Sequence, residues 1–259
     1  MRTDVRRLRM PVAVAALALV AGCGSGGGKI APPSPALGTV VDFTLPSTIA
    51  NLPLTTSEGT KTSLAAYRGR PVMIADFMTD CTDICPMISA NTAALARALT
   101  ADGYGGKVAL LEISMDPERD TLPRLRAYRK LFGAPLADWA LLRASHADTL
   151  RLWRYLGLEM KRVKEGSPPD KDWLTHKPLT YDIEHSDELI FLDAAGHERF
   201  VVSASPNVQG RALPRTLANI LGPQGRHLLH HPDPVTSWTV GQGLSVFSWL
   251  VDHRLTLPE

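Results

Sequence analysis

The chain has 259 residues, 44% of them hydrophobic, which is enough for one globular domain of ordinary size plus additional segments. Its formal net charge is +2, but residues 1–22 hold four arginines and one aspartate, so the rest of the chain carries −1. Without a basic surplus there is no electrostatic basis for binding nucleic acid, and that class of partner is excluded.

The first 22 residues have the parts of a secretory signal peptide. Arginine-rich MRTDVRRLRM precedes the apolar run PVAVAALALV, which is shorter than the about 20 residues of a transmembrane anchor. The ending Val20-Ala21-Gly22-Cys23 resembles a lipoprotein box, which implies a diacylated Cys23 and an extracytoplasmic protein that is lipid-anchored to a bacterial membrane. Residues 23–38 are rich in Gly, Ser and Pro and predict a flexible linker after the lipidated cysteine.

From residue 39 the chain alternates strand-like and helix-like segments. VVDFTL (40–45), PVMIADF (71–77) and KVALLEIS (107–114) predict strands, and residues 82–100 predict an alanine-rich helix. Further helices are expected over 120–133, capped by Asp120, over 145–157 and over 213–221, and residues 188–203 predict two strands around an Ala-Gly turn. This order predicts an α/β fold over residues 39–221, in which helices flank a central mixed β-sheet.

Residues 222–259 form a C-terminal extension. Trp238, Phe247, Trp249 and Leu250 give it an apolar face that is expected to pack on the domain. His227, His230 and His231 have the spacing i, i+3, i+4, which suits a second metal ion if the segment is helical. Beside the sequence PDP, solvent-facing histidines are the favoured interpretation.

With Cys23 assigned to the lipid, the exported part keeps only two thiols, Cys81 and Cys85. A disulfide between them would close a very short loop and remove little entropy from the unfolded chain, so a purely structural disulfide is disfavoured. At i and i+4 on the first turn of a helix, their Cβ atoms would be about 5–6 Å apart, against about 3.8 Å in a disulfide. This spacing favours a shared soft ion, and two thiolates with one imidazole suit copper(I).

The remaining polar candidates have structural alternatives. His185, just before the strand ELIFL, could supply the imidazole or could have a loop or capping role. Asp80 and Asp83 are interpreted as helix caps that also attract a cation. Asp116 and Arg119 are better explained by an Asp-Pro turn than by catalysis.

Three motifs, TDCTDICP (79–86), ISMDPERDT (113–121) and YDIEHS (181–186), together resemble the Sco/SenC copper chaperones over residues 40–221. These are thioredoxin-like proteins that help to assemble the binuclear copper centre of cytochrome c oxidase. The resemblance implies a thioredoxin-like fold with an inserted hairpin, and copper, as Cu(I) or Cu(II), bound by Cys81, Cys85 and His185. The sequence departs from the family pattern at two positions. Thr82 stands where the family commonly has proline, and Met78 stands where it commonly has an aromatic residue. Both changes could alter the reduction potential of the cysteine pair.

Two functions of different classes remain open. In the first, the resemblance implies a metallochaperone that delivers copper to the copper-binding subunit of cytochrome c oxidase and receives it from a copper donor. In the second, Cys81 and Cys85 are the redox-active pair of a thiol-disulfide oxidoreductase that reduces a partner's cysteines and is itself served by a thioredoxin-like reductant. A thioredoxin-like peroxidase is a third hypothesis, although nothing in the sequence points to peroxide as a substrate. Whether the protein is an enzyme is therefore undecided, and His185 separates the first two functions because disulfide exchange does not use it.

Overall fold

The computed structural model describes residues 29–233 and 237–258. The predicted signal peptide, Cys23 and the first linker residues lie outside these ranges. Within them, no helix combines the length and the apolar character needed to cross a membrane.

An eight-stranded mixed β-sheet forms the centre of the protein. In order across the sheet, its strands are β1 (Thr39–Thr44), β10 (His197–Val202), β9 (Leu189–Leu192), β4 (Val72–Phe77), β5 (Ala109–Ser114), β6 (Trp139–Arg143), β2 (Leu54–Thr56) and β3 (Lys61–Thr62). β4, β5 and β6 pair in parallel, and the other neighbours pair antiparallel. The mixed sheet confirms the predicted thioredoxin-like α/β class.

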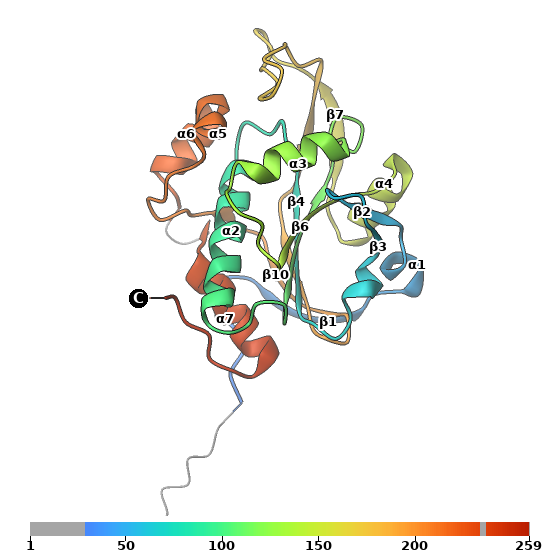
Figure 1. Cartoon of the computed structure of the whole chain (residues 1–259), viewed down its shortest axis with the longest axis vertical. Helices are drawn as coiled ribbons and strands as arrows, with labels where there is room; N and C mark the ends of the chain where they lie inside the picture. Colours follow the sequence, from blue (N-terminus) through green and yellow to red (C-terminus); the bar gives the residue numbers. More distant parts are fainter. Residues whose placement is uncertain (1–28, 234–236, 259) are drawn as a thin grey trace, which may run out of the picture.

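Helices cover both faces of this sheet (Figure 1). One core contains α2 (Cys85–Ala101), α3 (Leu122–Lys130) and α7 (Val240–Val251), and the other contains α1 (Ser47–Ala50), a 3₁₀ helix (Leu64–Tyr67) and α4 (His146–Tyr155). Side chains alternate along β4, so Met73 and Phe77 join the first core while Val72 and Ile74 join the second. Every residue of β4 is buried, as expected for a central strand between two helical layers.

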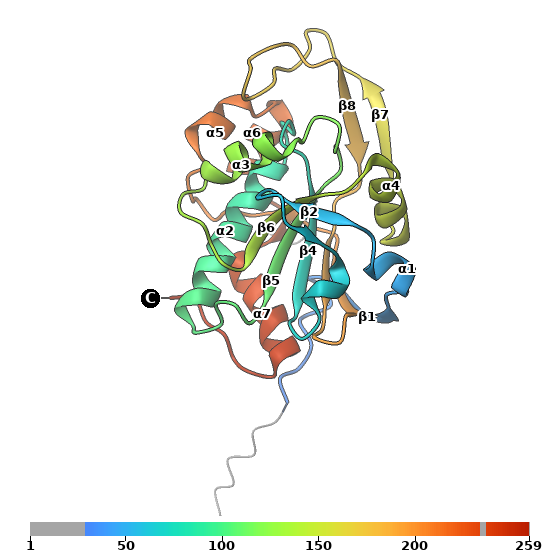
Figure 2. The same cartoon turned by 45° about the vertical axis from the view of Figure 1, so that its right-hand side comes forward.

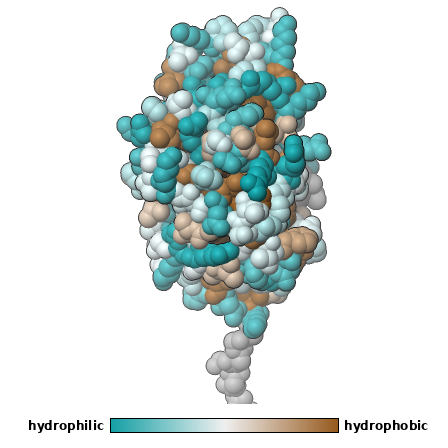
Figure 3. Space-filling view, turned by 90° about the vertical axis from the view of Figure 1, so that its right-hand side faces the viewer, coloured by the Kyte–Doolittle hydropathy of each residue, from teal (hydrophilic) through white to brown (hydrophobic). Residues whose placement is uncertain are grey.

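The surface over α1 and α4 is mostly hydrophilic, with hydrophobic residues in small separate groups (Figure 3). α4 buries Leu152 and Trp153 beneath this surface. Its start is as predicted, because Ser145 Oγ accepts a hydrogen bond of 3.1 Å from the Asp148 N–H. It ends before Gly157, which has φ of 86°.

A separate hairpin rises beyond the main sheet (Figure 2). It consists of β7 (Met160–Lys164) and β8 (Tyr181–His185), paired antiparallel so that Met160 is opposite His185. This is the inserted hairpin implied by the family resemblance. It matters for the site because β8 ends at His185.

The end of the chain packs on the domain, as its apolar face predicted. After α5 (Arg215–Ile220) and α6 (Pro223–His230), β12 (Ser237–Trp238) pairs in parallel with β11 (Ser205–Pro206). Trp238 and Phe247 are buried in the core, and Trp249 and Leu250 pack against it. α7 lies directly on α2, since a Cβ on Gly243 would be 3.0 Å from Leu95.

Candidate metal centre

Cys81 and Cys85 lie between the end of β4 and the start of α2. Both are free thiols, and both are buried. The helix predicted over residues 82–100 begins three residues later than expected. α2 starts at Cys85, so only that cysteine is helical. Pro86 is accommodated in the first turn of a helix, but it would clash with the Thr82 carbonyl if the helix included residue 82. The prediction that both cysteines lie on the first helical turn is therefore wrong, and Cys81 belongs to the preceding loop.

The two thiols differ in acidity. The Cys85 N–H donates a hydrogen bond to Cys81 Sγ, with 3.3 Å between nitrogen and sulfur. A hydrogen bond with the Cys85 side chain lowers the pKa of Cys81 against the effect of burial, and the charge of His185 lowers it further. Burial and the neighbouring Cys81 raise the pKa of Cys85 well above its usual range. Cys81 is therefore the thiol that ionises first.

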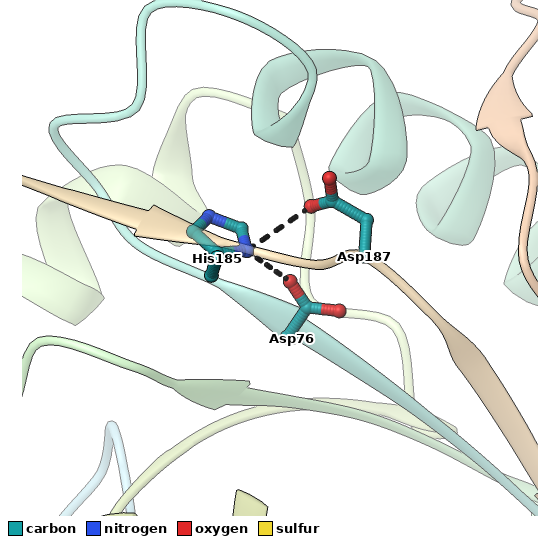
Figure 4. Close-up of side chains that lie close together, drawn as sticks. All are labelled: Asp76, His185 and Asp187. Carbon is teal, nitrogen blue, oxygen red and sulfur yellow. Dashed lines mark ion pairs between the residues drawn. The ribbon is translucent and has the colours of Figure 1, made fainter. Parts of the chain in front are cut away.

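His185 ends β8, and its ring faces two carboxylates (Figure 4). Its Nδ1 lies 3.1 Å from Asp76 Oδ2 and 3.3 Å from Asp187 Oδ1. Burial disfavours the charged ring, but the neighbouring carboxylates of Asp76 and Asp187 raise the pKa of His185 to about 10. The other ring nitrogen points away from both carboxylates, so it is the one available to bind a metal ion.

Sequence reasoning missed both carboxylates. Asp76 lies in the buried central strand, and its other oxygen accepts a hydrogen bond of 3.1 Å from the Glu188 N–H. The signal that could have found it is a carboxylate within the apolar run PVMIADF, because a buried charge requires a partner. Asp187 carries no such signal, since it follows His185 in a polar loop.

Cys81 and His185 line one pocket of about 300 Å³, whereas Cys85 is fully buried behind Cys81. The pocket walls come from the loop 82–84, the end of β8 and α6. Within the described ranges, the one set of three His, Cys, Asp or Glu side chains whose donor atoms all lie within 4.8 Å is Asp76, His185 and Asp187. The structure therefore brings the two cysteines together and places His185 on the same pocket, without gathering all three around one point.

A buried ionic network holds the loop before Cys81. Arg124 of α3 pairs with Asp80, donates to Thr79 Oγ1 at 2.6 Å and reaches Asp172 at 2.7 Å in the loop between β7 and β8. Burial raises the pKa of Asp80, while the Arg124 charge opposes that rise. Asp80 therefore does not cap a helix, contrary to the prediction, because its carboxylate is committed to Arg124.

Asp120 is part of the same network. It accepts hydrogen bonds from Thr79 Oγ1 at 2.5 Å and from Ser114 Oγ at 2.6 Å, and burial raises its pKa to about 6. The predicted cap at Asp120 is wrong, since α3 begins at Leu122 with Thr121 in the N-cap position. Asp120 instead links the ends of β4 and β5.

The motifs ISMDPERDT and YDIEHS meet through Arg119. This side chain pairs with Asp116, donates to the Tyr181 carbonyl at 2.7 Å and stacks on the Tyr181 ring at 4.0 Å. Tyr181 in turn donates its hydroxyl to Asp116 at 2.9 Å. These contacts hold the start of β8, the strand that ends at His185, which agrees with a structural role for Asp116 and Arg119.

Helix α6 lies directly on the loop between the two cysteines, a contact that the sequence did not indicate. The Gly222 N–H donates to the Thr82 carbonyl at 2.8 Å. A Cβ on Gly225 would be 2.5 Å from the Thr82 carbonyl oxygen and 2.7 Å from that of Asp83, so only glycine fits there. The Asp83 carboxylate lies 3.5 Å from the Cβ position of Gly222, beside α6, and the N-cap of α2 is Ile84, so the predicted capping role of Asp83 is also wrong.

Comparisons with known proteins give the family to which the sequence is similar. The sequence profile of the family described as SCO1/SenC matches residues 46–221. No curated protein matches the chain. Similar solved structures include Bradyrhizobium japonicum ScoI with copper bound, at 24% identity, covering 70% of this chain and 96% of that one, with a TM-score of 0.48. Arabidopsis thaliana ScoI with copper bound shares 19% identity, covering 66% of this chain and 94% of that one, with a TM-score of 0.48. A SCO1/SenC family lipoprotein from Bacillus anthracis str. Ames shares 18% identity, covering 65% of this chain and 88% of that one, with a TM-score of 0.47.

Proposed function

The chain belongs to the SCO1/SenC family, and we propose that it is a copper chaperone for the assembly of cytochrome c oxidase. In this proposal Cys81, Cys85 and His185 hold one Cu(I) ion, which passes to the copper-binding subunit of the oxidase. The observation that carries the proposal is that Cys81 lines the same pocket as His185. Cys85 is hydrogen-bonded to Cys81 through its N–H, and the ion pair with Asp76 leaves the other ring nitrogen of His185 free.

The chemistry of the three donors suits a soft, low-coordinate ion. Thiolates select Cu(I), and Cys81, whose pKa is lowered, is the first of the two cysteines to ionise. The ion pair between His185 Nδ1 and Asp76 and the 3.0 Å contact of the same nitrogen with the Ser186 carbonyl orient the ring, as second partners do for metal-binding histidines. Binding releases the protons of Cys85 and His185, so the affinity for Cu(I) rises with pH.

The donors must move together to close around the ion. Two thiolates and an imidazole on one ion lie about 4.5 Å apart or less, given bonds of about 2.0–2.3 Å. The three side chains lie further apart than this in the structure, so binding of the ion would draw them together. Cys81 and His185 line a surface pocket, so an ion held there would be accessible to the ligands of an acceptor, as transfer by ligand exchange requires.

A second candidate function is supported by the unequal acidity of the two thiols. The Cys81 thiolate attacks a partner's disulfide, which gives a mixed disulfide, and Cys85 then displaces the partner as a dithiol. The protein is left with a Cys81–Cys85 disulfide, and a thioredoxin-like reductant restores it. This oxidoreductase activity needs no His185.

The location belongs to the same proposal. Diacylation of Cys23 and cleavage before it would anchor the protein outside the cytoplasm of a bacterium. The predicted linker over 23–38 is too long, because the Ile30 N–H donates to Asp252 Oδ1 at 2.8 Å and Leu37 is buried in the core, so the tether would end before Ile30. An oxidase subunit with an extracytoplasmic copper site would then be within reach. The mass of the N-terminal peptide of the mature protein tests this, because an unmodified Cys23 would contradict the anchor.

The test of the chaperone function is competition for Cu(I) against a chromogenic chelator, without oxygen and with reduced thiols. Cys81→Ser, Cys85→Ser and His185→Ala should each weaken Cu(I) binding, whereas exposed His176→Ala serves as the matched control and should bind as the parent does. His185→Ala should still form the disulfide. Equal Cu(I) affinity in the parent and His185→Ala would refute the Cys2His site and leave the oxidoreductase function.

A further inference from the structure

Two exposed histidines at the end of α6 form a side-by-side pair. The His231 N–H donates to the His227 carbonyl at 2.8 Å, so His231 caps the C-terminal end of α6, whose last helical residue is His230. The two rings have centroids 5.1 Å apart and planes at 34°. The condition set by the sequence, that the histidine segment be helical, is met for His227 and His230 but not for His231, and the ring contact joins His227 to this capping residue.

This separation suits one metal ion between the rings. Two imidazoles bound to one ion at about 2.0 Å per bond have centroids about 4.5 Å apart at a right angle and about 5.2 Å apart at the tetrahedral angle. The observed 5.1 Å falls in this range. Rotation of the two exposed side chains would aim one nitrogen of each ring at such an ion.

The pair lies close to the pocket of Cys81 and His185 but is not part of it. Gln224 and Leu228 of α6 form part of the pocket wall. An eight-residue helix is about 12 Å long, so His227 and His231 lie within roughly one helix length of that wall. α6 also lies beyond residues 46–221, the segment that the family profile matches.

We propose that His227 and His231 form a second metal site, which binds divalent first-row ions with Cu(II) the tightest. Imidazole suits copper, nickel and zinc, and Cu(II) ranks highest in the general order of affinities. The donors differ in kind from the thiolates of the first site, which select Cu(I). The proposal goes beyond the chaperone function and does not depend on it.

The experiment uses the full chain with Cys81→Ser, Cys85→Ser and His185→Ala, so that the first site is removed. Titration with Cu(II), followed by electron paramagnetic resonance, should show one bound ion with coupling to two imidazole nitrogens. Adding His227→Ala or His231→Ala should weaken Cu(II) binding about tenfold or more. Loss of a residue that only hydrogen-bonds to a metal ligand already lowers metal affinity by about that factor, and here a ligand itself is lost. Circular dichroism should show unchanged folding, because both side chains are exposed.

His230→Ala is the matched control, because it removes a neighbouring exposed histidine from the same helix. Its Cu(II) affinity should equal that of the parent. Unchanged affinity in the His227→Ala and His231→Ala variants, or an equal loss in His230→Ala, would overturn the proposed pair. If the Cu(II) titration shows no such pair, the Cu(I) competition experiment is unaffected, so the two proposals can be tested separately.

Discussion

Asp76 and His185 form a buried pair, with 3.1 Å between Asp76 Oδ2 and His185 Nδ1. Asp76 lies in β4, whose residues are all buried, so a central strand of the sheet orients the imidazole at the rim of the pocket. The free nitrogen of the ring is thereby determined before any metal arrives.

Replacing Asp76 by Asn tests this orientation. Loss of the carboxylate charge should lower the pKa of His185 from about 10 toward or below its usual value, because burial then acts with less opposition. Cu(I) affinity should fall by about 10- to 100-fold. Titration of the His185 ring by NMR, together with chelator competition, measures both effects. An unchanged His185 pKa would show that Asp76 does not control the ring.

Alkylation of the reduced, metal-free protein tests the unequal thiols. Because the pKa of Cys81 is lowered and that of Cys85 is raised, iodoacetamide should modify Cys81 first, with a midpoint below the usual value for a thiol. His185→Ala removes a positive charge and should move that midpoint to higher pH. Peptide mapping by mass spectrometry identifies the modified residue. Earlier modification of Cys85 would contradict the assignment.

Gly225→Ala tests the contact between α6 and the cysteine loop. The new Cβ would lie 2.5 Å from the Thr82 carbonyl oxygen, so α6 should shift and the protein should lose about 1–3 kcal/mol of stability. Cys81 should become more reactive. Gly241→Ala is the control, because its Cβ would meet nothing nearer than 3.8 Å and Ala favours the helix. Equal thermal unfolding of both variants would argue against the contact.

Arg124→Met tests the network before Cys81. It leaves the buried Asp80 carboxylate without its closest cation, which should cost about 3–5 kcal/mol in urea unfolding of the metal-free protein. Adding Asp80→Asn should restore part of that loss. Arg126→Met, on the exposed side of the same helix, should change stability by much less. If Arg124→Met and Arg126→Met unfold alike, Asp80 does not depend on Arg124.

The fold was largely predictable because burial leaves a local pattern. The apolar runs that became β4, β5 and β9 and the capped segment of α4 each carry their own signal. The errors lie at helix starts, where tertiary contacts decide. Asp80 and Asp120 look like caps in sequence, but Arg124 and Thr79 hold them in a buried network.

The site was predictable only in part. The cysteine pair stands out by counting thiols, and His185, a candidate from its place before a strand, was selected over a loop or capping role by the family resemblance. The pairings that shape the site cannot be read from the sequence. Asp76 is marked only as a carboxylate within an apolar run, its partner His185 lies far along the chain, and α6 meets Thr82 only in the folded structure. The hydrogen bond between Gly222 and Thr82 is a contact of this kind.

X-ray absorption of the Cu(I)-loaded protein tests the central claim most directly. A site formed by Cys81, Cys85 and His185 predicts two sulfur neighbours at about 2.3 Å and one nitrogen at about 2.0 Å, the usual lengths of such bonds. His185→Ala should lose the nitrogen and keep both sulfurs. A spectrum without the nitrogen shell in the parent protein, or the same spectrum in both proteins, would contradict the Cys2His site.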